Sequence, residues 1–390
     1  MRVVHLIKAK QIGGAERHLL MLLPALIKLG VEVHLVVLIE PDTPMDDLFA
    51  EAEERGIPAQ AIEINNHLDL VIINRIRATL NDLKPDILHT HLIHADTFGL
   101  GAGKLARVPH IITSRHNDDD FRNQRVVRLA SGVMWSGFKA CIAISDHIRN
   151  FVVDVEGGPA QKIHTIKYGI EHESPTQEAK DNARASLIAE LDVAEDSYLI
   201  GMACRLVEQK GVDVAIKAMT ELHREYPNAH LIIAGDGELK HALVHEVAQL
   251  GLTDAVHFLG WRVDVPQIML GLDIFWVPSR WEGFGLVALE AMSKRTPVVA
   301  SRVSALPEVV ADEESGLLVP VDDAPALAEA TRALLDDRSL RVHMAMVGED
   351  RVESLFSVER MAEETYALYR RFVPEQPRTT TTVKRKVSIG

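Results

Sequence analysis

Two glutamates stand eight positions apart in the string EGFGLVALEAM: Glu282 opens it and Glu290 lies near its end. Two glycines bracket a phenylalanine between them, and a helix-forming run begins near Gly285 or Leu286. The amino end of a helix presents unpaired backbone N–H groups and a partial positive charge, so it seats phosphate well, and glycine lets a ligand approach the backbone. Carboxylates beside that seat would repel phosphate, so we expect both glutamates to bind neutral hydroxyl groups.

Two cations form a second candidate element. Arg205 and Lys210, in GMACRLVEQKG, follow a strand-like run and precede a helix-like one. Open α/β sheets bind ligands at loops that follow the carboxyl ends of parallel strands, and two cations there suit a diphosphate. Gly13 and Gly14, in KAKQIGGAERH, lie between the first strand and the first helix and offer a third place where backbone N–H groups approach an anion.

Alternating strand and helix patterns must position these residues. Short runs such as RVVHLI, VEVHLVVL, AHLIIAGDG and TPVVAS alternate with amphipathic segments such as GVDVAIKAMTELHREY. This rhythm predicts parallel sheets with helices on both faces, and 390 residues suit two such domains meeting at a cleft. We expect domains at 1–167 and 186–356, a linker at 168–185, a last helix at 357–373 and a disordered tail at 374–390.

Bulk composition excludes several classes of protein. Apolar residues make up 47% and charged residues 25% of the chain, as in a folded globular protein. The formal net charge of −14 argues against a nucleic-acid partner. Cys141 and Cys204, the two cysteines, lie in apolar runs and are expected to be buried reduced thiols. No run approaches the roughly 18 apolar residues of a membrane span, so we expect a cytoplasmic protein, at most peripheral at the inner membrane face.

The order of these motifs resembles glycosyltransferase family 4, the glycosyl transferases group 1. The resemblance covers residues 1–373, and its most specific part is the E-x7-E of EGFGLVALE followed by AM, TPVVAS, LPEVV and SGLLVP. Members are retaining enzymes of the GT-B fold, with two doubly wound Rossmann-like domains facing across a cleft. The family's last helix usually crosses back to the N-terminal domain.

The resemblance implies a role for each matching residue. Glu290 would bind the ribose hydroxyls of the nucleotide, and Glu282 the hydroxyls of the donor sugar. Arg205 and Lys210, in the family's R-x4-K pattern, would neutralise the departing diphosphate, and His116 in TSRHN would lie near the donor sugar. Further donor contacts would come from the backbone of Phe284, Gly285, Leu286 and Val287, from Gly14 beside the diphosphate, and from Trp261 and Arg262 around the base. The family often has a proline where this chain has Val287.

The implied reaction is transfer of a hexose from a nucleotide-diphospho sugar to a hydroxyl on a glycan or lipid-linked acceptor, in the synthesis of bacterial surface glycans or glycolipids. The family generally needs no protein-bound metal, so we expect no cofactor; a requirement for Mg²⁺ stays open. A GT-B epimerase or hydrolase of nucleotide sugars and a non-catalytic nucleotide-sugar binding subunit are the alternatives. The donor nucleotide (UDP, GDP or ADP), the sugar, the acceptor and the oligomeric state stay open.

Two further features invite other interpretations. The string LHTHLIHAD holds His89, His91 and His94, whose spacing suggests a metal, but no fourth ligand is evident and we expect no metal site. Residues 121–139 carry arginines at helical spacing beside apolar residues. Docking on an anionic membrane and packing on the sheet both stay open for this segment, and packing is favoured.

Overall fold

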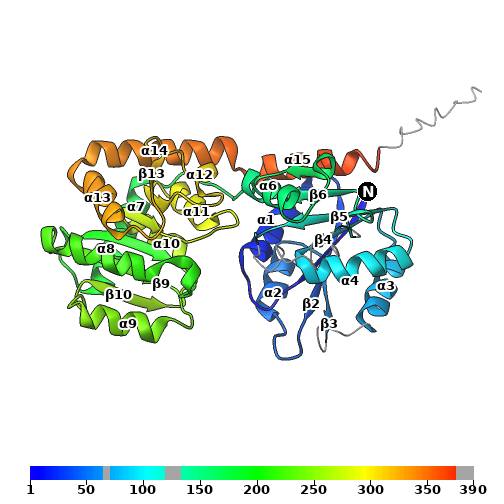
Figure 1. Cartoon of the computed structure of the whole chain (residues 1–390), viewed down its shortest axis with the longest axis horizontal. Coiled ribbons are helices and arrows are strands. Elements are labelled where there is room, and N and C mark those ends of the chain that lie inside the picture. The colour runs from blue at the N-terminus through cyan, green and yellow to red at the C-terminus, as the bar shows by residue number, and fades with distance from the viewer. Residues whose placement is uncertain (65–70, 119–131, 133, 375–390) are drawn as a thin grey trace, which may run out of the picture.

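A computed structural model describes residues 1–64, 71–118, 132 and 134–374 of the chain. Two α/β domains lie side by side, each built around a parallel sheet (Figure 1). The predicted pair of doubly wound domains is thus confirmed. No helix within the described ranges has the length and apolar character needed to cross a membrane.

The N-terminal sheet has seven strands in the order β3-β2-β1-β4-β5-β6-β7. These strands are β1 (Arg2–Lys8), β2 (Glu32–Ile39), β3 (Ala59–Glu63), β4 (Ile87–His91), β5 (His110–Arg115), β6 (Ala140–Ala143) and β7 (Ile163–Thr165). The helices between them are α1 (Gly14–Lys28), α2 (Asp46–Glu54), α3 (Val71–Leu83), α4 (Leu92–Leu105) and α6 (Asp146–Asp154). Strands β1, β2, β4, β5 and β6 are almost wholly buried, as expected of a parallel sheet covered on both faces, whereas the edge strand β3 is mostly exposed.

The C-terminal sheet has six strands in the order β10-β9-β8-β11-β12-β13. They are β8 (Tyr198–Ala203), β9 (Ala229–Ala234), β10 (Val256–Gly260), β11 (Ile274–Val277), β12 (Val298–Ser301) and β13 (Gly316–Val319). Helices α7 (Gln177–Leu191), α8 (Val212–Glu225), α9 (Lys240–Gln249), α10 (Val265–Gly271), α11 (Leu286–Ser293), α12 (Leu306–Val309), α13 (Ala324–Asp336) and α14 (Arg338–Leu355) surround it. A 3₁₀ turn, η3 (Glu208–Lys210), precedes α8.

Strand order places the candidate residues together. In each sheet the first strand lies between the second strand and a later one: β1 between β2 and β4, and β8 between β9 and β11. At such a switch point the loops that follow the two central strands diverge and leave a crevice for a ligand. The glycine pair follows β1, the R-x4-K loop follows β8, and the E-x7-E loop follows β11.

The expected linker at 168–185 is only partly a connection, because residues 177–185 belong to α7. The sequence of this segment lacks an apolar rhythm since Leu187 is the one buried residue of the helix. Thr176 caps the helix by accepting a hydrogen bond from the Ala179 N–H group. A helix exposed on most sides therefore looks like a polar linker in the sequence.

The last helix, α15 (Val358–Arg370), lies on the N-terminal domain, whereas α14 lies on the C-terminal one (Figure 1). The Tyr369 hydroxyl bonds to Nδ1 of His89 on β4 at 2.6 Å. Met361 accepts a hydrogen bond on its sulfur from the Gly169 N–H group at 3.2 Å. The chain therefore crosses between the domains twice, and the two crossings are joined by a bridge between Ile170 and Ser357.

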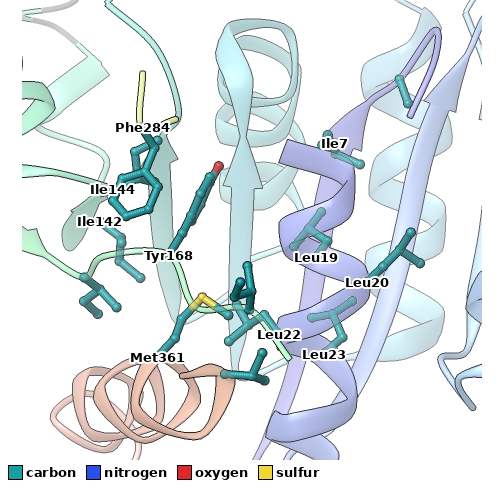
Figure 2. Close-up of a cluster of buried hydrophobic side chains, with 14 of the residues drawn as sticks. Ile7, Leu19, Leu20, Leu22, Leu23, Ile142, Ile144, Tyr168, Phe284 and Met361 are labelled. Carbon is teal, nitrogen blue, oxygen red and sulfur yellow. The ribbon is translucent and has the colours of Figure 1, made fainter. Parts of the chain in front are cut away.

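One apolar cluster continues from the N-terminal domain into the loop before α11. Phe284 of that loop is buried, and its ring packs edge-on against Tyr168 with centroids 5.1 Å apart (Figure 2). The Phe356 ring, just before α15, also packs edge-on against Phe284, with ring centroids 5.9 Å apart. The Phe284 side chain thus anchors the E-x7-E loop between the domains.

Two segments singled out in the sequence fall largely outside the described residues. These are 121–131 and 133 of the expected basic helix, and 375–390 of the expected tail. At the described end of the basic segment, Trp135 and Phe138 are buried in the core of the N-terminal domain.

Candidate functional site

Glu282 lies in the loop between β11 and α11, with 6% of its surface exposed. Its Oε1 atom accepts a hydrogen bond from the Ser279 hydroxyl at 2.9 Å and pairs with the Lys210 ammonium group. Among the described residues, no group donates a hydrogen bond to the second oxygen, Oε2. The protein thus holds the carboxylate through one oxygen and leaves the other able to accept a hydrogen bond. A small pocket beside it is lined by Met202, Cys204 and Val287, together with Lys210, Ser279 and Glu282.

The amino end of α11 follows directly. Gly285 has φ of 92°, in the left-handed region, and a Cβ atom there would lie 2.6 Å from Cδ2 of Leu306. Glycine is therefore required twice over, for the backbone conformation and for the space. Gly285 has no side chain to cap the helix, so the first N–H groups of α11 carry the positive end of its dipole without a competing acceptor from the cap residue.

Glu290 lies on the second turn of α11 and is partly buried. Burial raises the pKa of its carboxyl group above the ordinary 4.5, while the cations of Arg17 and Lys294 act in the opposite direction. Arg17 belongs to α1 of the N-terminal domain. The Glu290 carboxylate is therefore within electrostatic reach of the opposite domain.

The two cations of the R-x4-K loop differ in their surroundings. Arg205 is exposed just beyond β8, whereas Lys210 ends η3 and pairs with Glu282. Burial raises the pKa of the neighbouring Cys204 thiol to about 12, and the charges of Lys210 and Arg205 oppose that rise. Both cations thus act on the same point at the end of β8. The high pKa keeps Cys204 a protonated thiol.

The glycine pair after β1 meets the E-x7-E loop across the domain boundary. A Cβ atom on Gly14 would lie 3.7 Å from Cδ1 of Leu286, the first residue of α11. The amino ends of α1 and α11 therefore lie close together. Glu16 modifies the expected anion site, because its buried carboxylate accepts a hydrogen bond from the Gly13 N–H group at 2.9 Å. One of the N–H groups expected to receive an anion is thus already paired.

His116 reaches the site through its main chain. A Cβ atom on Gly283 would lie 2.3 Å from the His116 carbonyl oxygen, so the backbones of the two domains touch here. The His116 ring points inward, where its Nε2 atom bonds to Nδ1 of His91 at 3.0 Å and its Nδ1 atom bonds to the Tyr168 hydroxyl. Ser145 adds a hydrogen bond to the Gly283 carbonyl oxygen at 3.3 Å.

Trp261 and Arg262 lie apart from this group. They follow β10, which is separated from β8 by β9 in the sheet. Trp261 is 69% exposed. The Arg262 guanidinium group pairs with Asp264 at 2.6 Å and with Glu190, and these hydrogen bonds raise its pKa. Arg262 therefore already has two carboxylate partners.

The histidines of LHTHLIHAD separate at the end of β4. His89 and His91 are buried in the strand, and β1 pairing brings His5 beside them, so that ring nitrogens of the three lie within 4.8 Å of one another. His94 lies instead on the first turn of α4, because the strand ends at His91 and Leu92 turns the chain with φ of 68°. The structure therefore groups His89 and His91 with His5 and not with His94, the third histidine considered in the sequence.

Three residues at the site were missed in the sequence. Ser279 bonds to Glu282, Arg17 acts on Glu290, and Glu308 of α12 contacts the N-terminal domain. The Glu308 carboxylate accepts hydrogen bonds from the N–H groups of Asp146 at 2.9 Å and His147 at 2.8 Å. Of the three, only Ser279 could have been suspected from the sequence, because it lies three residues before Glu282. The contacts of Arg17 and Glu308 join different domains, so no local pattern indicates them.

Comparison with known proteins agrees with this geometry. A model of Glycosyltransferase Family 4 matches residues 12–174, and a model of Glycosyl transferases group 1 matches residues 183–351. An alpha-maltose-1-phosphate synthase of Mycobacterium tuberculosis is 30% identical over 387 residues, which are 92% of this chain and 95% of that protein. The lipopolysaccharide core biosynthesis mannosyltransferase LpsB of Rhizobium meliloti is 35% identical over 196 residues, 48% of this chain and 55% of that protein.

A solved structure shares the whole architecture. The crystal structure of Anabaena HepE in complex with UDP-glucose superposes with a TM-score of 0.83 at 21% identity, covering 95% of this chain and 100% of that one. Likeness at this identity establishes the fold, and the expected GT-B arrangement is confirmed.

Proposed function

Because the chain belongs to glycosyltransferase family 4, we propose that it is a retaining hexosyltransferase that moves a hexose from a nucleotide-diphospho sugar to a hydroxyl group. One observation carries the proposal. The Lys210–Glu282 pair lies at the carboxyl ends of β8 and β11, beside the amino end of α11. A cation and a helix amino end suit a diphosphate, and a half-bonded carboxylate suits sugar hydroxyls.

The chemistry follows from where charge develops. The bond between the anomeric carbon and the phosphate oxygen breaks, so negative charge gathers on the diphosphate and positive charge on the sugar. Lys210, Arg205 and the amino end of α11 stabilise the former by preorganised electrostatics. The acceptor oxygen then bonds to the anomeric carbon on the face that the diphosphate leaves, and its proton passes to a phosphate oxygen. Such front-face attack retains the configuration without a covalent intermediate on the enzyme.

The relatives suggest which substrates to test first. HepE was solved with UDP-glucose, and LpsB and the mycobacterial synthase are named for mannosyl transfer and for maltose-1-phosphate synthesis. We therefore place UDP-glucose first among the donors, followed by GDP- and ADP-sugars. Glycan and lipid-linked hydroxyls are the acceptors to test, and we expect the protein in the cytoplasm, at most peripheral at the inner face of the membrane.

The decisive experiment measures release of nucleoside diphosphate from a panel of UDP-, GDP- and ADP-sugars, with and without an acceptor mixture. We expect one donor to be turned over, acceptor to stimulate release, and Glu282→Ala to abolish it. Glu353→Ala, which removes an exposed carboxylate from α14, is the control and should match the wild type. Full activity of Glu282→Ala would show that the site is assigned wrongly.

The same assay separates the alternatives. A nucleotide-sugar epimerase or hydrolase would convert the donor at the same rate with and without acceptor. A binding subunit would bind nucleotide saturably and release nothing from any donor or acceptor tested.

Metal dependence is a further arm of this assay. We propose that protein cations serve the diphosphate, so treatment with EDTA should leave the rate within about twofold of the untreated enzyme. A collapse of activity that Mg²⁺ restores would show that a metal carries the charge that we assign to Lys210 and Arg205.

A further inference from the structure

A continuous series of hydrogen-bonded side chains runs from the site into the N-terminal domain. We call it the histidine chain; in order it comprises Tyr168, His116, His91, His5, Tyr369, His89 and Ser114. Two links between imidazole rings measure 3.0 Å each, from His116 to His91 and from His91 to His5. Tyr369 joins His5 at 3.5 Å and His89 at 2.6 Å, and His89 joins Ser114 at 2.7 Å. Tyr168 bonds to His116 at the other end.

The interior of this chain is neutral. Burial lowers the pKa of His5 to about 3 and holds those of His89 and His91 well below the ordinary value, with neighbouring histidines adding to the effect. Burial likewise holds the pKa values of Tyr168 and Tyr369 well above the ordinary 10. At neutral pH these imidazoles therefore carry one proton each, and the phenols keep theirs.

A neutral imidazole has one donor nitrogen and one acceptor nitrogen, so the chain has a direction. If Tyr168 donates to Nδ1 of His116, then each Nε2–H group donates onward, to Nδ1 of the next ring or to a hydroxyl oxygen, as far as Ser114. If Ser114 donates to His89 instead, every ring carries its proton on Nδ1. When the Tyr369 hydroxyl donates to one of its two ring partners and accepts from the other, the atoms in contact allow these two arrangements, and in both of them all four histidines share one tautomer.

We propose that His91, His5 and Tyr369 are positioning residues for His116, and that they fix its tautomer and hold its ring through this one directional chain. The proposal rests on the proposed function and deepens it, because the His116 main chain contacts Gly283 beside Glu282. Tyr369 lies on α15, the helix that crosses from the other domain, so the seating of that helix is linked to the loop that holds the donor.

A metal ion is the competing occupant of this cluster. His5, His89 and His91 could present three nitrogens to it, but each ring already uses both nitrogens in the links of the chain. A bound ion would break the link between His91 and His5 and place the rings in unlike tautomers. The two occupants are therefore distinguished by the tautomers of the rings.

The test is long-range ¹H–¹⁵N NMR of the full-length, unliganded, metal-free protein with ¹⁵N-labelled histidine, whose signals separate the two tautomers. Single His→Gln variants assign the four rings. We expect His5, His89, His91 and His116 to share one tautomer. In Tyr369→Phe, which keeps the ring but removes the linking hydroxyl, the population of the second tautomer should rise at His5 and His116. Tyr366→Phe on the same helix is the control and should leave both signals unchanged.

Unlike tautomers among the four rings would overturn the proposal, as would a Tyr369→Phe spectrum identical to that of the wild type. Saturable shifts of these signals on titration with Zn²⁺ would also overturn it, in favour of a metal site. These readouts need no turnover, so they stand whether or not a donor is found. A shared tautomer in a protein that turns over no donor would count against the proposed function alone.

Activity tests the positioning role separately. His91→Gln keeps one donor and one acceptor, whereas His91→Leu removes both. We expect His91→Leu to lower kcat for the donor by about threefold to tenfold, the scale of one lost hydrogen bond, with nucleotide affinity unchanged, and His91→Gln to recover most of the loss. Equal rates in wild type and His91→Leu, with both folded, would refute a positioning role.

Discussion

At the scale of single residues, the site depends on carboxylates whose surroundings differ. Glu282 is held by Lys210 and Ser279 through one oxygen, which fixes its direction at the end of β11. Burial disfavours the charged form of the Glu290 carboxyl group, and the positive charges of Arg17 and Lys294 offset part of that cost. A carboxylate that is costly in the folded protein and is retained at a site is typical of a residue kept for function.

This cost yields a prediction for Glu290→Gln. Because the folded pKa is raised, the folded state binds the proton more tightly than the unfolded chain, so the carboxyl group favours folding at low pH and disfavours it as the pH rises through that pKa. The amide removes the penalty. Thermal unfolding should therefore occur at a higher temperature in Glu290→Gln than in wild type at neutral pH, and the difference should vanish in acid.

The same variant should bind nucleotide more weakly at neutral pH, since an amide is a poorer acceptor for ribose hydroxyls than a carboxylate. Wild-type affinity should fall toward that of the variant as the pH is lowered through the Glu290 pKa. Isothermal titration at several pH values measures both trends. A wild type whose nucleotide affinity shows the same pH dependence as that of the variant would remove Glu290 from the binding site.

At the scale of elements, the loop from β11 into α11 restricts most strongly which residue types can stand at its positions. Phe284 anchors it in the apolar cluster, and Gly283 and Gly285 are confined by the His116 carbonyl oxygen and by Leu306. The anchor and the two glycines together set where the amino end of α11 points.

Gly285→Ala tests this element. The substitution places a side chain at φ of 92° and 2.6 Å from Leu306, and we expect it to cost about 1–3 kcal/mol of folding free energy and to weaken nucleotide binding. Urea unfolding and titration with nucleotide measure the two effects. Gly251→Ala is a matched control, because Gly251 also has positive φ, of 70°, but a Cβ atom there meets nothing within 4 Å. Equal nucleotide affinity in both variants would show that the α11 terminus does not bind phosphate.

At the scale of the whole molecule, Glu308 fastens the domains at the amino end of α6. It belongs to the C-terminal domain and accepts two N–H groups of the N-terminal one, and Lys167 pairs with it at 2.9 Å. The carboxylate therefore acts as a cap supplied by the other domain, and the helix dipole adds to the attraction.

Removing this cap should loosen the domain contact without unfolding either domain. In Glu308→Ala we expect hydrogen exchange at the first turn of α6 to speed up by roughly twofold to thirtyfold, the range for loss of a helix cap. Glu314→Ala, an exposed neighbour, is the control. Unchanged protection in Glu308→Ala would mean that other contacts hold the domains together.

Local sequence patterns by themselves determine the fold class and the family of this protein. Strand runs and helical spacing between residues 1 and 373 determine two parallel sheets, since alternation of buried strands with amphipathic helices has few other solutions. The order of strings around Glu282 and Glu290 likewise determines the family, because a helix start with its glycines and flanking acids is a contiguous feature. Where the local pattern is weak, the prediction was less accurate: the exposed helix α7 begins within the segment expected to be a linker.

Only the tertiary structure decided which distant residues meet. Lys210 and Glu282 are 72 positions apart and pair because β8 and β11 are neighbours in the sheet. His5 joins His89 because β1 pairs with β4 in that register, which no spacing within either strand predicts. The partners of the His116 ring are likewise distant in the sequence, because they are His91 of β4 and Tyr168. Strand order and register bring together chemistry that lies far apart along the chain.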